Sequence, residues 1–235
     1  MDYNESSRKL KEVLELQGSP VAVAFMTERP TGLKKVRGKN TVCVMIQRAR
    51  MGRGLYCSSS NIICGGKLHL GMSKSIGINL ENFLVKTEKI AASEIAAKRL
   101  LGMNKSRAPD KLGKYLAFAP LELATFNPEV ILFIGTPLQI GRIMWLDAYQ
   151  TGQITTIHGE PVCSGVIAAP ISRGKIGVSF LDMACRSLGR YKPEEMIIGV
   201  PFHRVERILE SIDKSIGGTA KPNPALRFLP WLIKP

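Results

Sequence analysis

The chain has 235 residues, enough to bury a sizeable core as one large domain or two small ones. Hydrophobic residues make up 45% and charged residues 22% of it, an ordinary globular composition that excludes disordered and fibrous proteins. The formal net charge of +14 favours an anionic partner, either a small anionic ligand or substrate or a nucleic acid. Nucleic acid is the less favoured of the two, because no Lys/Arg run is long or interleaved with aromatic residues.

The sequence predicts a cytoplasmic protein without a membrane partner. Its first residues, MDYNESSRKLKEVLELQ, are polar and lack the apolar segment of a signal peptide. No apolar run reaches the roughly 18 residues that a membrane span requires. Thiols stay reduced in the cytoplasm, so the five cysteines favour metal binding, catalysis or core packing over disulfides.

Helices and strands are expected to alternate in the first half of the chain. Ser6 or Ser7 would cap a helix that runs to about Leu16, and a buried strand follows over residues 20–26. A helix over residues 41–50 would place Cys43 near its N-terminus, where exposed N–H groups lower the pKa of a thiol. Further elements are a short strand over 54–57, a short helix after Ser58 and mostly helical structure over 80–103.

The second half continues the alternation. Strands are expected over residues 116–121, 130–134, 176–181 and 195–200, and helices over 138–149 and 201–216. The predicted fold class is therefore α/β or α+β, with a mixed sheet flanked by helices and a strand order that the sequence does not indicate. We expect a single domain over residues 1–235, with two similar halves at about 1–115 and 116–220 as an alternative and an irregular, proline-rich tail over 221–235.

Four of the five cysteines stand in two similarly spaced pairs. Cys43 and Cys64 are 21 residues apart, Cys163 and Cys185 are 22 apart, and each interval holds an Arg-Gly pair before a predicted strand. If one sheet brings the pairs together, the four thiolates would suit an iron–sulfur cluster or zinc. The spacing matches no compact metal motif, so buried core cysteines without a cofactor are the alternative. Cys57 is expected to take no part.

Basic residues and glycines near these cysteines predict a small-anion pocket. It would be lined by Arg48, Arg50, Arg190 and the turn at Gly65 and Gly66. The turn itself is not a nucleotide phosphate loop, since leucine follows Gly65-Gly66-Lys67 where that loop needs serine or threonine.

Two further functions remain open. One of the cysteines could act as a nucleophile without a metal, for example Cys64 paired with His158. Alternatively, the basic chain could bind nucleic acid. The sequence decides neither whether the protein is an enzyme nor its oligomeric state.

Several segments together resemble a known family. They include Pro20-Val-Ala-Val-Ala-Phe, Cys43 with Arg48-Ala-Arg-x-Gly52, Cys64-Gly-Gly-x-x-x-Leu-Gly71, Cys163 before a small apolar strand, and Cys185-x-x-x-Gly-Arg190. The pattern resembles the domain-of-unknown-function family number 169, found largely in archaea and anaerobic bacteria. The resemblance implies that the four paired cysteines occupy recurrent positions and that Cys57 is extra. An acidic residue often precedes the second cysteine in that family, whereas Asn61-Ile-Ile63 stands there in this chain.

The leading hypothesis from the sequence is a cytoplasmic metal-binding protein. Cys43, Cys64, Cys163 and Cys185 would hold an iron–sulfur cluster, or alternatively zinc, beside the basic small-anion pocket. Such a site would serve a redox role.

Overall fold

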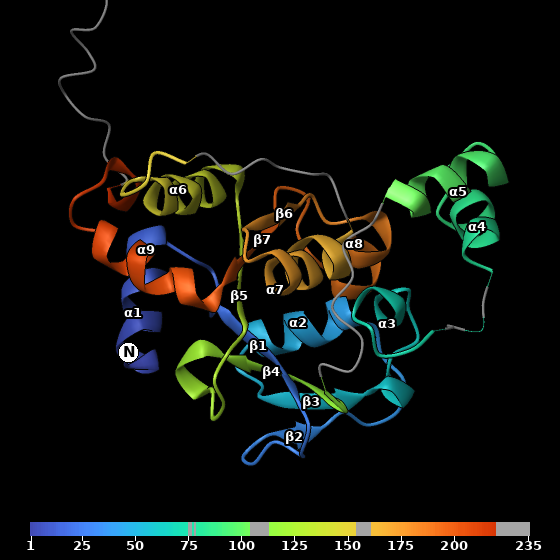
Figure 1. Ribbon diagram of the computed structural model, residues 1–235, viewed down its shortest axis with the longest axis horizontal. Coiled ribbons are helices and arrows are strands. Elements are labelled where there is room, and N and C mark those ends of the chain that lie inside the picture. The colour runs from blue at the N-terminus through green and yellow to red at the C-terminus, as the bar shows by residue number, and fades with distance from the viewer. Residues whose placement is uncertain (75–76, 78, 104–112, 154–160, 220–235) are drawn as a thin grey trace, which may run out of the picture.

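The computed structural model of the chain describes residues 1–74, 77, 79–103, 113–153 and 161–219. Within these ranges seven strands form one mixed sheet in the order β2-β3-β4-β1-β5-β7-β6 (Figure 1). β2 runs parallel to β3, and the other strand pairs in the described ranges are antiparallel. The strands are β1 (Val21–Met26), β2 (Lys34–Lys35), β3 (Leu55–Ser58), β4 (Tyr115–Pro120), β5 (Val130–Gly135), β6 (Gly177–Ser179) and β7 (Met196–Pro201).

The central strands are buried on both faces, so side chains of alternate residues enter two separate cores. In β1, Val21 and Val23 belong to one core, while Ala22 and Ala24 belong to the other. This arrangement explains why the strand reads as a continuous apolar run instead of alternating with polar residues.

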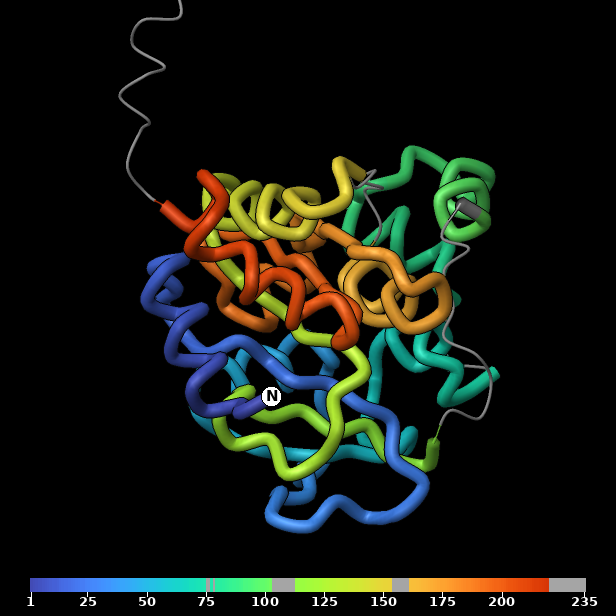
Figure 2. The backbone as a smooth tube through the Cα atoms, turned by 60° about the vertical axis from the view of Figure 1, so that its left-hand side comes forward, coloured from blue at the N-terminus to red at the C-terminus, as the bar shows by residue number. Residues whose placement is uncertain are grey.

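Helices cover each face of the sheet. One layer contains α1 (Tyr3–Leu14), α6 (Pro137–Ala148) and α9 (Val205–Ser211). The other contains α2 (Val42–Arg50), α3 (Gly66–His69), α7 (Ala169–Arg173), α8 (Met183–Gly189) and the π-helix η4 (Cys163–Ala168). Figure 2 shows the chain from a second direction, with the blue α1 at the left of the view and the orange α7 and α8 at the right. All five cysteines lie in or against the core under the second layer.

η4 approaches the sheet closely because two glycines face each other across β6 and β7. Gly177 pairs with Gly199 in the sheet register. A Cβ atom on Gly177 would meet the carbonyl oxygen of Gly165, and one on Gly199 would meet that of Val166. Only residues without a side chain let the π-helix pack directly on the strand backbone.

A smaller helical group lies beside the main body, next to α3 and α8 in Figure 1. It comprises α4 (Leu80–Asn82), the π-helix η2 (Phe83–Thr87) and α5 (Glu94–Met103), packed around Leu84, Ala91 and Ala97. The remaining short helices are η1 (Ser59–Asn61), η3 (Leu121–Leu123), η5 (Phe202–Arg204) and η6 (Ile216–Gly218). In the part of the chain described, no helix combines the length and the apolar character needed to cross a membrane.

The predicted fold class is confirmed: a mixed sheet is flanked by helices. Three local predictions are wrong. α1 begins at Tyr3 instead of after Ser6 or Ser7, because the carboxylate of Asp2 accepts the N–H groups of Asn4 and Glu5. The segment after Cys163 is the π-helix η4 instead of a strand. The short helix expected after Ser58 was to contain Ile62, Ile63 and Cys64, but η1 covers only Ser59–Asn61 and α3 begins at Gly66.

Candidate functional site

The first two cysteines of the site meet because α2 packs against α8. Cys43 is the second residue of α2, whose first turn is capped by the side chain of Thr41. Cys185 is the third residue of α8, and Asp182 caps that helix by accepting the N–H of Cys185 over 2.9 Å. The two cysteines form a disulfide with their Cα atoms 5.5 Å apart.

Cys64 and Cys163 form a second pair around Gly66. A Cβ atom placed on Gly66 would lie 2.6 Å from the sulfur of Cys163 and 3.3 Å from that of Cys64. Both sulfurs therefore crowd the same face of the glycine, and both remain free thiols. Of the four paired cysteines, Cys64 alone is partly exposed; the other three are buried.

The pair is electrostatically asymmetric. A hydrogen bond from the Cys163 thiol lowers the pKa of Cys64 to about 6, and the N–H groups of Val42 and Gly66 add to this effect against the opposing influence of burial. The same hydrogen bond raises the pKa of Cys163 well above its ordinary value, with burial and the charges of Cys64 and Asp182 acting in the same direction. At neutral pH the pair is therefore one thiolate held by one thiol.

Two side chains connect this thiol pair with the disulfide. The hydroxyl of Tyr191 donates to the carbonyl oxygen of Cys43 over 2.9 Å, and burial raises the pKa of Tyr191 well above its usual range. Asp182 caps the helix of Cys185 and also acts on Cys163 through its charge. The two cysteine pairs thus share their immediate surroundings.

The metal-binding hypothesis is wrong. Among the residues that the structure describes, no group of three or more histidine, cysteine, aspartate or glutamate side chains is placed to hold a metal ion. No metal site forms among these described residues because the cysteines are paired with each other. The sulfurs of Cys43 and Cys185 are joined in a disulfide, and the side chains of Cys64 and Cys163 are hydrogen-bonded. The four sulfurs do not converge on one centre, so the iron–sulfur cluster and the zinc ion lose the donor set on which they depended. The expectation that the cysteines stay reduced is also wrong, because Cys43 and Cys185 form a disulfide.

The predicted anion-pocket residues lie in different environments. The guanidinium of Arg50 is buried and forms an ion pair with Glu195 at 2.7 Å, so its charge is already compensated. Arg48 and Arg190 are exposed, and Arg190 adopts the left-handed conformation that ends α8. The N–H of Gly66 donates to the Cys64 thiolate, and Gly65 precedes it at the start of α3. Anion binding by these residues stays a prediction, as does binding of nucleic acid.

The remaining candidate side chains are Cys57 and the three histidines. Cys57 is buried in β3, and burial followed by the charge of Cys64 raises its pKa to about 12. His158 lies outside the described residues, so its pairing with Cys64 stays a prediction. His69 ends α3, and His203 belongs to η5.

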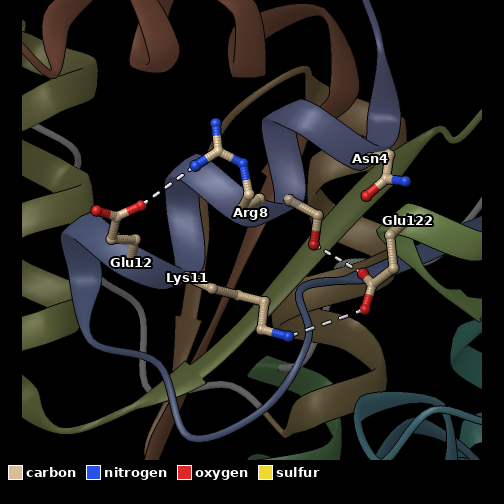
Figure 3. A pocket seen from close by; sticks show the side chains of 6 residues that line it. Asn4, Arg8, Lys11, Glu12 and Glu122 are labelled. Atoms are coloured by element: carbon tan, nitrogen blue, oxygen red, sulfur yellow. Dashed lines mark hydrogen bonds and ion pairs between the residues drawn. The ribbon is translucent and has the colours of Figure 1, made fainter.

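A surface hollow lies beside α1, where hydrogen bonds to Glu122 hold the chain together. It has a volume of about 470 Å³ and is lined by polar side chains of α1 and by Glu122 (Figure 3). Glu122 accepts hydrogen bonds from Ser7 at 2.7 Å and Ser19 at 2.5 Å, which tie α1 to η3. No cysteine is among the described residues that line this hollow.

Sequence reasoning missed three contributors to the site. Asp182 was detectable, because aspartate three residues before Cys185 is a usual helix-capping signal. Tyr191 and Glu195 were not, because their roles depend on contacts with Cys43 and Arg50, which are more than a hundred residues away.

We expect Gly66→Ala to disrupt the thiol pair. The new methyl group would force the Cys163 sulfur away from Cys64, so the pKa of Cys64 should rise toward the ordinary thiol value of about 8.5. Alkylation of Cys64 at pH 7 should slow accordingly when followed by mass spectrometry. Gly65→Ala is the matched control, since its Cβ would only touch Leu80 at an ordinary 3.7 Å. Equal effects of the two substitutions would contradict the assigned geometry.

Comparison with known proteins agrees with the resemblance seen in the sequence. The model of the DUF169 family, described as uncharacterised ArCR, matches residues 9–211. The chain is also similar to the uncharacterized protein MJ0308 of Methanocaldococcus jannaschii, with 27% identity over 226 residues that cover 91% of this chain and 96% of the relative. No solved structure matches the chain. With the family match spanning most of its length, the chain belongs to the DUF169 family.

Proposed function

We propose that the protein carries out thiol–disulfide exchange, with Cys64 as the attacking thiolate and Cys163 as the resolving thiol. One observation carries the proposal: the sulfurs of the partly exposed Cys64 and the buried Cys163 lie against the same glycine, and the hydrogen bond between them lowers the pKa of Cys64. Exchange requires a thiolate that can reach its target and a second thiol within reach of the mixed disulfide.

The chemistry balances without a further reactant. The Cys64 thiolate would attack one sulfur of a substrate disulfide and release the other half as a thiolate. Cys163 would then attack the Cys64 sulfur and release the second half of the substrate, while its proton passes to a departing thiolate. The substrate is reduced by two electrons, and the protein is left with a Cys64–Cys163 disulfide.

The substrate class follows from access and charge. Cys64 is only partly exposed, which favours a small or extended disulfide over a folded protein surface. The formal net charge of +14 favours a substrate that carries negative charge. In this proposal the protein works in the cytoplasm, where a thiol pool would return the Cys64–Cys163 disulfide to the dithiol.

Alkylation as a function of pH tests the attacking group. In wild type, the rate at which iodoacetamide labels Cys64 should reach half its maximum near pH 6, fall below that pH and stay high above it. Cys163→Ala removes the main hydrogen bond, so the midpoint should move up toward about 8.5. Cys57→Ala should leave it unchanged, because that thiol is neutral throughout the range. A wild-type midpoint near 8.5 would remove the basis of the proposal.

Turnover tests the reaction itself. The reduced protein should reduce 5,5′-dithiobis(2-nitrobenzoate), and Cys64→Ser should abolish the reaction. Equal rates for wild type and Cys64→Ser would overturn the proposal.

A further inference from the structure

We infer that the buried Cys43–Cys185 disulfide exchanges with the Cys64–Cys163 couple, so that the protein transfers a disulfide between its interior and its surface. The inference rests on the proposed function and adds a second redox couple to it. Disulfides in a folded core are usually structural links, so an exchange role requires that a thiol can reach this one and that the exchange can proceed.

Access favours Cys64 as the route to the buried disulfide. Cys43 is 6% exposed and Cys185 is 3% exposed, so an external thiol cannot attack either sulfur directly. Cys64 is partly exposed and lies against the same core as both. In this inference an external thiol therefore reaches the buried disulfide through Cys64.

Geometry places Cys64 beside the first turn of α2, the turn that carries Cys43. Its thiolate accepts the N–H of Val42, the residue directly before Cys43 in the first turn of α2. Val42 also lies against Gly66, about which Cys64 and Cys163 meet: a Cβ on Gly66 would be 3.0 Å from its side chain. Tyr191 and Asp182 contact or act on members of both pairs. The proposed exchange would require the Cys64 side chain to turn from Cys163 toward Cys43.

The exchange can be written with every electron and proton in place. The Cys64 thiolate attacks the Cys43 sulfur, a Cys64–Cys43 bond forms, and Cys185 leaves as a thiolate. Cys163 next attacks Cys64, releasing Cys43 as a thiolate, and the proton of Cys163 passes to Cys185. The products are a Cys64–Cys163 disulfide, one thiolate and one thiol, the same charge and proton count as at the start.

The position of Cys43 favours its release in the second step of the exchange. Its sulfur is attached to the first turn of α2, a helix of nine residues whose free N–H groups stabilise negative charge. A thiolate stabilised in this way is a better leaving group in the second step.

Trapping the intermediate tests the inference. Cys163→Ser can complete the first step but not the second, so acid quenching and alkylation of unreacted thiols should give a peptide in which Cys43 is linked to Cys64, with Cys185 alkylated. In Cys64→Ser, reduction of the Cys43–Cys185 disulfide by glutathione should be at least about tenfold slower than in wild type. Cys57→Ala serves as the control and should behave as wild type.

The outcomes separate the inference from the proposed function. Equal rates of Cys43–Cys185 reduction in wild type and Cys64→Ser, with no Cys43–Cys64 link in Cys163→Ser, would overturn the inference. If wild type still reduced external disulfides, the proposed function would stand and the buried disulfide would be purely structural. Failure of wild type to reduce any external disulfide would overturn the proposed function itself.

Discussion

Replacing Arg50 with methionine is expected to lower the free energy of unfolding by about 3–5 kcal/mol. Arg50 and Glu195 are each only 5% exposed, and their side chains meet at 2.7 Å. Removing the guanidinium would leave the carboxylate of Glu195 buried and without its partner, which costs far more than the pair contributes when intact. Denaturant unfolding of oxidised protein at pH 7 measures the difference.

The double variant Arg50→Met with Glu195→Leu provides the decisive comparison. It should recover most of the lost stability, because both charges leave the core together. Lys9→Met is the surface control: the Lys9–Asp213 pair is exposed, so its loss should change the free energy of unfolding by at most about 1 kcal/mol. An Arg50→Met protein as stable as the control variant would show that the buried ion pair has no structural role.

The same pair predicts a direction for the effect of pH. Burial opposes ionisation of Glu195, but hydrogen bonds from Arg50 and the Lys192 N–H hold the pKa of its carboxyl below the usual value. A carboxyl with a lowered pKa in the folded state stabilises the protein above its unfolded pKa of about 4.3, and that stabilisation disappears as the pH falls through the folded value. Acid should therefore narrow the stability gap between wild type and Arg50→Met.

Gly199→Ala is expected to cost about 3 kcal/mol and to disturb the thiol site at a distance. The new Cβ would occupy the position of the Val166 carbonyl oxygen, which is backbone and cannot rotate away. η4 would have to move off β7 and take Cys163 with it. We therefore expect both a lower free energy of unfolding and a higher pKa of Cys64, measured by denaturant unfolding and by pH-dependent alkylation.

A glycine in open space is the matched control for Gly199. Gly141 lies inside α6, and a Cβ there would meet nothing within 4 Å. Gly141→Ala should stabilise the protein by about 0.5–1 kcal/mol and leave the pKa of Cys64 unchanged. If Gly199→Ala lowered stability without changing the pKa of Cys64, the position of η4 would not control the thiol pair.

Local sequence signals predicted much of the fold. The strand at Val21–Met26, the helix at Val42–Arg50 and the strand at Val130–Gly135 follow from apolar runs between turn residues, and the structure has them within a residue or two. The π-helix η4 escaped prediction because its conformation depends on Gly177 and Gly199, which come later in the chain. The spacing of apolar residues within η4 does not indicate that its backbone packs against two glycines elsewhere in the chain.

The candidate site was predicted only in outline. Spacing grouped Cys43 with Cys64 and Cys163 with Cys185, whereas the fold pairs Cys43 with Cys185 and Cys64 with Cys163. The observed pairing differs because α2 packs on α8 while α3 packs on η4. Neither of these helix contacts can be predicted from the local sequence. The sequence therefore predicted four equivalent metal ligands, whereas the structure has one disulfide and one hydrogen-bonded cysteine pair.

Mapping the disulfide that forms after one turnover tests whether Cys64 and Cys163 act as an exchange couple. Protein with free Cys64 and Cys163 is mixed with one equivalent of 5,5′-dithiobis(2-nitrobenzoate), quenched with acid, alkylated and digested for mass spectrometry. The account predicts two equivalents of released aromatic thiolate and a peptide pair linked through Cys64 and Cys163. Release of one equivalent, with the other half of the reagent left on Cys64 and Cys163 recovered as an alkylated thiol, would contradict it.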